Sequence, residues 1–123
     1  MVCFGKRKVG DGEPCFITFE AGATHNGVET AGRLANYAKE AGADAVKFQI
    51  IDPDRLVADR EMEFTYEVLA DRETGRRETV SEPLYDILQR RYLSVEEWKQ
   101  VKRHCDAFGL SFFATAFFEE DID

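Results

Sequence analysis

From residue 15 onward, a short apolar run is followed by a segment in which apolar residues recur at helical spacing. Residues 15–20 are β-prone and end at the small-residue turn 21–23, so they predict a buried strand. Apolar residues at helical spacing follow over 31–41, and Gly42 supplies a left-handed stop. With Asn26 as its expected N-terminal cap, this segment predicts a helix and completes a first strand–helix unit.

The same alternation continues through the rest of the chain. Residues 43–50 are too short and too apolar at their centre for a second amphipathic helix, and they predict a second buried strand. Ser94 and Glu97 have the spacing of a capping box and predict a helix that stops at Gly109. A third strand is expected over 110–115. Three parallel strands with intervening helices indicate an α/β fold.

The connecting segments complete a division of the chain into four parts. Val2 to Phe4 and Lys8 to Val9 flank a turn at Gly5 and Lys6 and predict a small N-terminal hairpin. Ser81 is expected to cap a short helix inside an unusually long loop. The parts are the hairpin 1–14, two strands and a helix 15–52, the long loop 53–93, and a helix, a third strand and the start of a further helix 94–123.

The length sets a limit on the architecture. A closed (β/α)₈ barrel needs about 250 residues, and this chain has 123. We therefore expect a single incomplete domain, namely a partial (β/α)₈ TIM barrel of about three βα units. Because an open parallel sheet leaves strand edges and apolar faces exposed, a homo-oligomer or a complementing C-terminal chain is expected to complete it.

Composition and charge exclude several classes of function. The formal net charge is -8, which disfavours nucleic acid and anionic membrane surfaces as partners. The apolar runs are too short to cross a bilayer, and the basic-then-apolar layout of a secretion signal is missing. Cys3, Cys15 and Cys105 lack zinc-site spacing and predict buried thiols in a reducing compartment. A cytoplasmic protein is expected.

Polar residues gather where the predicted strands end. Glu20 closes the first strand, Lys47 and Gln49 the second, and Thr115 the third. Parallel strands bring their carboxyl ends to one rim, which is where ligands bind in such sheets. An ammonium, an amide and a hydroxyl beside a helix N-terminus at Asn26 fit an anionic, oxygen-rich substrate.

Three stretches at these positions carry a family resemblance: 19–27 (FEAGATHNG), 41–49 (AGADAVKFQ) and 113–117 (FATAF). Together they resemble the N-terminal part of the N-acetylneuraminate (sialic acid) synthase family, over nearly the whole chain. The resemblance implies an enzyme, a transferase that condenses phosphoenolpyruvate with an N-acetylmannosamine-type sugar in a TIM barrel. The products are a nonulosonic acid and phosphate, so the process is carbohydrate biosynthesis.

The resemblance also implies roles for individual residues. Lys47 and Thr115 match family residues that contact phosphoenolpyruvate, and Gln49 matches one that faces the sugar. Glu20 matches the acidic residue at the end of the first strand, for which we infer proton transfer or orientation of a hydroxyl or water. We take Glu20 and Lys47 as catalytic candidates, and Gln49, Thr115, His25 and Asn26 as substrate-binding candidates.

The resemblance further implies a divalent metal, Mn or Mg, that polarises the sugar aldehyde. The family's metal ligands come from later strands, so none is assigned within this chain. The sequence departs from the family at Thr24, where Asn is usual, and at 114–118, where the family reads Ser-Thr-Pro-Phe-Asp or similar. No residue is assigned to the choice of sugar.

Other interpretations use the same residues differently. Glu20 and Lys47 could form a purely structural ion pair, and His25 could orient the turn by hydrogen bonding or, less in keeping with its neighbours, bind a metal ion. At the level of the whole chain, one alternative is a non-catalytic half-barrel that binds an anionic ligand or a partner chain. Another is a phosphoenolpyruvate- or aldol-type barrel enzyme that shares only the architecture.

Overall fold

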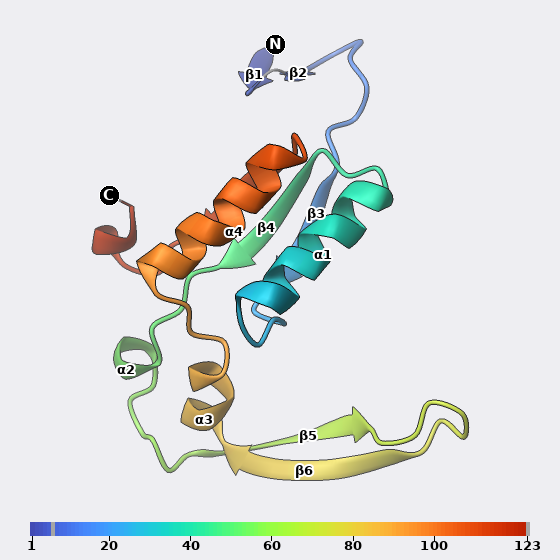
Figure 1. Cartoon of the computed structure of the whole chain (residues 1–123). Helices are drawn as coiled ribbons and strands as arrows, with labels where there is room; N and C mark the ends of the chain where they lie inside the picture. Colours follow the sequence, from blue (N-terminus) through green and yellow to red (C-terminus); the bar gives the residue numbers. More distant parts are fainter. Residues whose placement is uncertain (6, 123) are drawn as a thin grey trace. The chain divides into compact units, whose positions relative to one another are not determined.

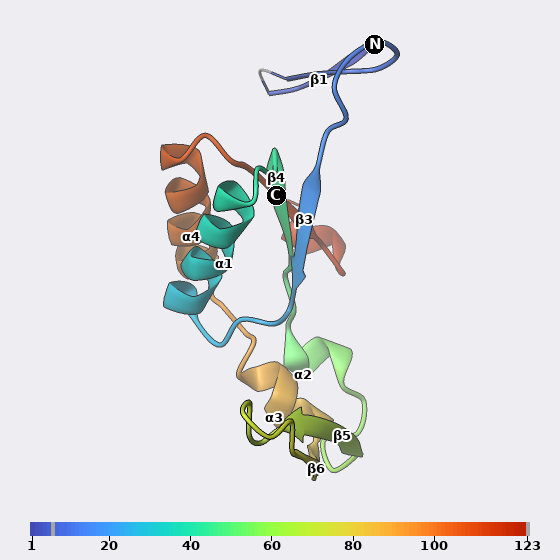
Figure 2. The ribbon, with the colours of Figure 1, turned by 90° about the vertical axis from the view of Figure 1, so that its right-hand side faces the viewer.

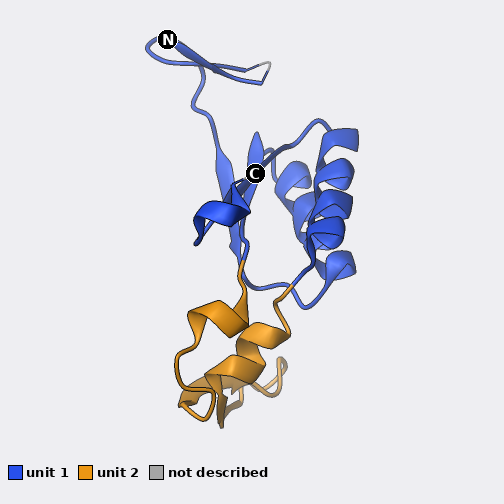
Figure 3. Cartoon of the chain, turned by 90° about the vertical axis from the view of Figure 1, so that its left-hand side faces the viewer, with its two compact units in different colours: residues 1–50, 93–123 blue, residues 51–92 orange. Residues whose placement is uncertain are grey.

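A computed structural model describes residues 1–5 and 7–122. The chain folds into two compact units, which Figure 3 shows in different colours. The first unit contains residues 1–50 and 93–123, and the second contains residues 51–92.

The first unit is built on a three-stranded parallel sheet covered by two helices. The strands are β3 (Thr18–Gly22), β4 (Ala45–Gln49) and β7 (Ser111–Thr115), in the order β3-β4-β7. The helices α1 (Val28–Glu40) and α4 (Val95–Ala107) lie on the same side of this sheet (Figures 1 and 2). The predicted α/β class and the three parallel strands are confirmed.

The two helices start in different ways. Ser94 and Glu97 form the predicted capping box at α4, with the Glu97 carboxylate accepting from the Ser94 N–H at 2.8 Å. The predicted cap of α1 at Asn26 is wrong, because Gly27 is the N-cap and contributes no side chain. Asn26 instead accepts a hydrogen bond from the hydroxyl of Thr30 at 2.5 Å.

The core lies between the helices and one face of the sheet. Val46 and Phe48 of β4 are fully buried there, among the small and apolar residues that line α1 and α4. Because side chains alternate along a strand, Lys47 and Gln49 lie on the opposite face. The sequence of β4 therefore separates an apolar, helix-covered face from a face that carries polar residues.

The N-terminal hairpin is confirmed, with β1 (Val2–Phe4) and β2 (Arg7–Val9) paired antiparallel. Its predicted turn residue Lys6 lies outside the described residues. Phe4 packs against Phe16 and Phe113, with ring centroids 5.5 and 5.6 Å away. Lys47 and Phe113 are register partners, so the hairpin packs on the face that carries Lys47.

The second unit differs most from the sequence prediction. The long loop contains a hairpin of β5 (Glu63–Leu69) and β6 (Arg77–Pro83), and two short helices, α2 (Pro53–Leu56) and α3 (Leu84–Gln89). Ser81 lies within β6, so its predicted role as a helix cap is wrong. Polar side chains hold the unit together: Glu82 accepts from Tyr66 at 2.5 Å and from Arg90 at 2.7 Å.

Two smaller predictions are also corrected. Cys3 and Cys15 are exposed, and only Cys105 is a buried thiol, because the first two lie in and after the hairpin and outside the main core. The helix start expected near the C-terminus is a single 3₁₀ turn, η1 (Glu119–Asp121); Asp123 lies outside the described residues. No helix in the described part of the chain has both the length and the apolar character needed to span a membrane.

Candidate functional site

The parallel register brings the predicted strand-end residues onto neighbouring positions of one sheet face. Glu20 of β3 is the register partner of Lys47 of β4, and Gln49 of β4 is the partner of Thr115 of β7. Partners in a parallel pair point to the same side of the sheet. Four of the six predicted site residues are therefore placed together near the carboxyl ends of the strands.

Glu20 and Lys47 form a direct ion pair across β3 and β4. The Lys47 Nζ atom lies 2.7 Å from Oε2 of Glu20, and the two side chains are 36% and 54% exposed respectively. An ammonium has three N–H donors, of which Glu20 uses one. Lys47 can therefore hold Glu20 and still offer donors to an anion that approaches from solvent.

The ion pair sets the protonation state of the carboxylate. The hydrogen bond from Lys47 lowers the pKa of Glu20 below its ordinary value; partial desolvation acts against this, and the Gly22 N–H and the Lys47 charge act with it. Glu20 is therefore ionised at neutral pH. It can accept a hydrogen bond or a proton, but it carries no proton to donate.

Sequence reasoning missed a backbone contribution to this pair. The N–H of Gly22 donates to Oε1 of Glu20 at 3.0 Å, and the register of β3 shifts between these two residues. Gly22 has a φ of 56°, in the left-handed region that glycine enters without penalty. The glycine in the sequence Glu-Ala-Gly was the available signal, since a glycine inside a strand indicates a bulge.

Gln49 and Thr115 are only partly buried. They are the last paired residues of β4 and β7, and the backbone hydrogen bonding between the two strands continues beyond them. The N–H of Ile50, next to Gln49, donates to the carbonyl of Thr115 at 3.0 Å. The backbone of both strand ends is thus held in place, while their side chains are on the face of Lys47. An amide and a hydroxyl at these positions supply additional hydrogen-bonding groups beside the cation.

The remaining two predicted residues lie elsewhere. His25 is 0% exposed and packs against Phe48 and Trp98, with ring centroids 5.9 and 5.3 Å away. Phe48 belongs to the helix-covered face, so His25 is in the core and presents no surface to a substrate. Asn26 is exposed, and its side chain contacts Thr30 in the first turn of α1. Neither joins the Glu20–Lys47 pair.

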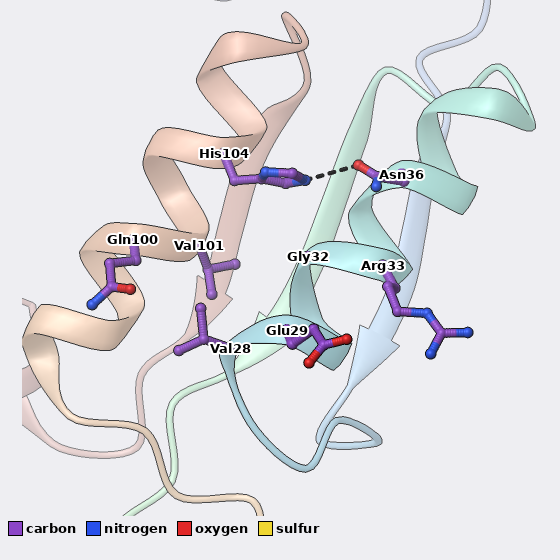
Figure 4. Close-up of a pocket in the computed structure, with 8 residues that line it drawn as sticks. All are labelled: Val28, Glu29, Gly32, Arg33, Asn36, Gln100, Val101 and His104. Atoms are coloured by element: carbon purple, nitrogen blue, oxygen red, sulfur yellow. Dashed lines mark hydrogen bonds between the residues drawn. The ribbon is translucent and has the colours of Figure 1, made fainter.

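A separate groove of about 400 Å³ lies between α1 and α4 (Figure 4). In it, Nε2 of His104 lies 2.8 Å from Oδ1 of Asn36, and Glu29, Arg33 and Gln100 also line it. The groove contains none of the predicted site residues. We locate the candidate site at the Glu20–Lys47 pair because ligands of parallel sheets bind at the strand ends.

The metal that the resemblance implies has no donor set here. Within residues 1–5 and 7–122, no group of three or more His, Cys, Asp or Glu side chains is placed to hold a metal ion. Glu20 already shares its oxygens with Lys47 and Gly22. The described residues do not fit the metal.

Comparison with known families connects this site to a group of proteins. The sequence model of the NeuB family matches residues 34–123. This range is most of the chain and includes Lys47, Gln49 and Thr115. The chain belongs to the NeuB family. It is 35% identical over 120 residues to N,N'-diacetyllegionaminic acid synthase of Legionella pneumophila, covering 97% of this chain and 32% of that protein.

Other NeuB-like proteins match over the same span. Human N-acetylneuraminate-9-phosphate synthase is 28% identical over 119 residues, covering 95% of this chain and 31% of that protein. The crystal structure of the sialic acid synthetase from Leptospira borgpetersenii superposes with a TM-score of 0.69 at 23% identity, covering 98% of this chain and 35% of the other. That structure shows a shared fold. This NeuB-family chain thus spans about a third of the length of the curated relatives it matches.

Proposed function

We propose that this chain provides the phosphoenolpyruvate-binding part of a sialic-acid-synthase-like enzyme. The overall reaction would join phosphoenolpyruvate to an N-acetylmannosamine-type sugar and release phosphate. The observation that carries the proposal is the Glu20–Lys47 ion pair, which lies on the strand-end face of a NeuB-family chain. The names of two relatives, both synthases of nonulosonic acids or their phosphates, support the reaction class.

Each candidate residue has a task in this reaction. Lys47 would bind the phosphate or carboxylate of phosphoenolpyruvate with the N–H donors that Glu20 leaves available. Thr115 would add a hydroxyl to the same anion, and Gln49 would face the sugar. Glu20, held ionised by Lys47, would orient the water that adds to the substrate or accept its proton.

The atoms balance with water as the third reactant. The C3 carbon of phosphoenolpyruvate bonds to the aldehyde carbon of the sugar, and the aldehyde oxygen takes up a proton. Water adds at C2 of the former phosphoenolpyruvate, and phosphate leaves. Fixed hydrogen-bond donors at the strand ends would stabilise the charge that develops on the oxygen atoms.

We propose that the site catalyses the condensation only together with additional polypeptide. The parallel sheet has β3 and β7 at its two edges, and the curated relatives are about three times as long as this chain. We infer a partial (β/α)₈ barrel that a second copy or a complementing C-terminal chain completes, with the metal ligands supplied from there. The reducing cytoplasm is the expected location, in keeping with the free thiols of Cys3, Cys15 and Cys105.

Binding without turnover is the second candidate. Ala114 and Ala116 stand where the resembling family carries Ser and Pro, so a hydroxyl and a rigid turn are replaced at the end of β7. In this case the chain would bind an anionic ligand or a partner chain as a non-catalytic half-barrel. A test of ligand binding must therefore be separated from a test of condensation.

The binding test is a phosphoenolpyruvate titration followed by thermal unfolding, with the mass of the chain measured by light scattering. Wild type should be stabilised by the ligand, and Lys47→Ala should lose this effect. Lys99→Ala is the matched control, because Lys99 also lies 2.7 Å from a glutamate oxygen but is on the outer surface of α4. Stabilisation of Lys47→Ala equal to that of wild type would refute the site.

The catalytic test adds the C-terminal portion of a longer NeuB-family synthase and measures phosphate release with an amino sugar. Condensation that depends on Lys47 and Glu20 would support the enzyme. Glu20→Gln should still bind phosphoenolpyruvate, because Lys47 is retained and a negative charge beside the anion is removed. Ligand binding by wild type without phosphate release under these conditions would favour the half-barrel.

A further inference from the structure

The Glu20 carboxylate is held at both of its oxygens, and one of the two contacts comes from the main chain. Oε2 accepts from Nζ of Lys47 at 2.7 Å, and Oε1 accepts from the N–H of Gly22 at 3.0 Å. A carboxylate that is bonded at both oxygens has little freedom to rotate. The direction in which Glu20 presents its charge to Lys47 therefore depends on where the Gly22 N–H points.

The direction of that N–H is set by a local irregularity in β3. Glu20 is the register partner of Lys47 and Gly22 is the partner of Phe48, so two steps along β3 correspond to one step along β4. Such a bulge changes the direction in which side chains and backbone groups point. The peptide group between Ala21 and Gly22 points its N–H at the side chain of Glu20, and the φ of 56° at Gly22 lets the strand continue from this orientation.

We propose that Gly22 is a positioning residue of the candidate site, whose left-handed backbone permits the peptide orientation that directs its N–H to Glu20 and thereby fixes the carboxylate on Lys47. The inference rests on the proposed function, because it assigns Gly22 a part in presenting Lys47 to phosphoenolpyruvate. Gly22 itself touches no substrate and acts through Glu20. Its contribution is conformational, and it uses no side chain.

A Cβ atom at position 22 would not clash with its surroundings, so steric room is not the reason for glycine there. A Cβ atom added to Gly22 would meet only Oε1 of Glu20, at 3.9 Å, which is an ordinary contact. The requirement is the positive φ, which asparagine tolerates and β-branched residues do not. Gly22→Asn should therefore keep the hydrogen bond, and Gly22→Val should break it by moving the backbone out of the left-handed region.

A matched control separates this effect from general backbone strain. Gly109 has a φ of 62°, and a Cβ atom there would meet nothing within 4 Å. It lies between α4 and β7 and has no carboxylate on its N–H; its amide donates to the carbonyl of Asp106. Gly109→Val thus introduces a similar strain without affecting Glu20.

The first measurement uses the wild-type chain and needs no substitution at Gly22. The amide proton shift of Gly22 is followed by NMR between pH 7 and pH 3, together with the side-chain carboxyl carbon of Glu20. Both signals should move in one transition, below the ordinary pKa of glutamate, and the amide transition should vanish in Glu20→Gln. A Gly22 amide that does not respond to the titration of Glu20 overturns the proposal.

The second measurement compares the variants. Gly22→Val should raise the pKa of Glu20 toward its ordinary value, because one of the hydrogen bonds that stabilise the ionised carboxylate is lost. Gly22→Asn and Gly109→Val should leave this pKa as in wild type. Equal effects of Gly22→Val and Gly22→Asn, or of Gly22→Val and Gly109→Val, would overturn the proposal.

The positioning of Glu20 by Gly22 and the binding of phosphoenolpyruvate can be tested independently of each other. The pKa of Glu20 reports on positioning and requires no ligand. If Gly22→Val changes that pKa while phosphoenolpyruvate binds none of the proteins, Gly22 positions Glu20 as proposed but the proposed function fails. If phosphoenolpyruvate binds wild type and Gly22→Val equally well, with Glu20 unaffected, the function stands and the role of Gly22 is refuted.

Discussion

The imidazole ring of His25 stands edge-on to the indole ring of Trp98, with centroids 5.3 Å apart and an angle of 85° between the planes. His25 follows the strand that carries Glu20, and Trp98 is in the first turns of α4. The contact therefore ties the turn after β3 to the helix layer. This geometry gives His25 a structural role at a position where the sequence suggested contact with a substrate.

Replacing His25 by alanine should destabilise the fold by about 2–4 kcal/mol, because it empties a fully buried site next to Phe48 and Trp98. Phosphoenolpyruvate affinity of the folded protein should change little, since His25 and Lys47 belong to different faces of the sheet. Urea unfolding followed by the fluorescence of the single tryptophan measures the first effect. The affinity is measured separately below the unfolding transition.

His104→Ala is the control for this prediction. His104 is only partly buried and makes a hydrogen bond with Asn36 at 2.8 Å, so its loss should cost about 1 kcal/mol. A larger loss for His104→Ala than for His25→Ala would contradict the assignment of His25 to the core. A large drop in phosphoenolpyruvate affinity for His25→Ala, with stability unchanged, would restore His25 as a binding residue.

The elements that the sequence predicted correctly are those whose signals are local. The capping box of Ser94 and Glu97 needs only residues three apart, and the apolar run around Val46 needs only a strand buried on one side. The β5–β6 hairpin was missed because most of its residues are exposed and its strands bury no continuous apolar face. Such strands are held by cross-strand pairs such as Thr65 with Ser81, which a hydrophobic pattern does not report.

The candidate site shows the same division. Glu20 and Lys47 could be paired from the sequence because parallel strands align their ends in a known way, and the structure places them in contact. The glycine after Glu20 could have indicated a bulge, but the contact of its N–H with Glu20 could not be derived, because it depends on how the register shifts between β3 and β4. The burial of His25 could not be derived either, since it depends on how the turn after β3 packs under α4.

The capping box predicts a dependence of stability on pH. Hydrogen bonds from the backbone N–H and the hydroxyl of Ser94 lower the pKa of Glu97. A carboxyl whose pKa is lower in the folded state stabilises the fold above its unfolded pKa, and this contribution is lost as the pH falls through the folded value. The stability difference between wild type and Glu97→Gln should therefore be largest at pH 7 and shrink below about pH 4.

Ser94→Ala tests the cause of that pH dependence. It should cost about 1 kcal/mol at neutral pH, as is typical of a lost N-cap. Adding Glu97→Gln in this background should have a smaller effect than in wild type, because the hydroxyl that Glu97 accepts from is gone. Equal effects of Glu97→Gln in both backgrounds, measured by urea unfolding at pH 7, would show that the two residues act independently.

The three cysteines should differ sharply in reactivity. Burial raises the pKa of the Cys105 thiol to about 11, and the charge of Asp106 acts in the same direction, so almost no reactive thiolate forms at neutral pH. Cys3 and Cys15 are exposed. Titration of the native chain with Ellman's reagent should show two fast thiols and a third only in denaturant. Three fast thiols in the native chain, or a fast phase that changes in Cys105→Ala, would contradict this assignment.

A glycine within α1 offers a stabilising substitution. Gly32 lies in the middle of the helix, where glycine costs about 1 kcal/mol relative to alanine. An added Cβ atom would meet only the ring of His104, at 3.6 Å, which is an ordinary contact. Gly32→Ala should therefore raise the free energy of unfolding by about 0.5–1 kcal/mol. Gly109→Ala, with its positive φ of 62°, should lower it although open space surrounds it. Destabilisation by both substitutions in urea unfolding would mean that His104 and Asn36 hold the α1–α4 contact too rigidly to admit one methyl group.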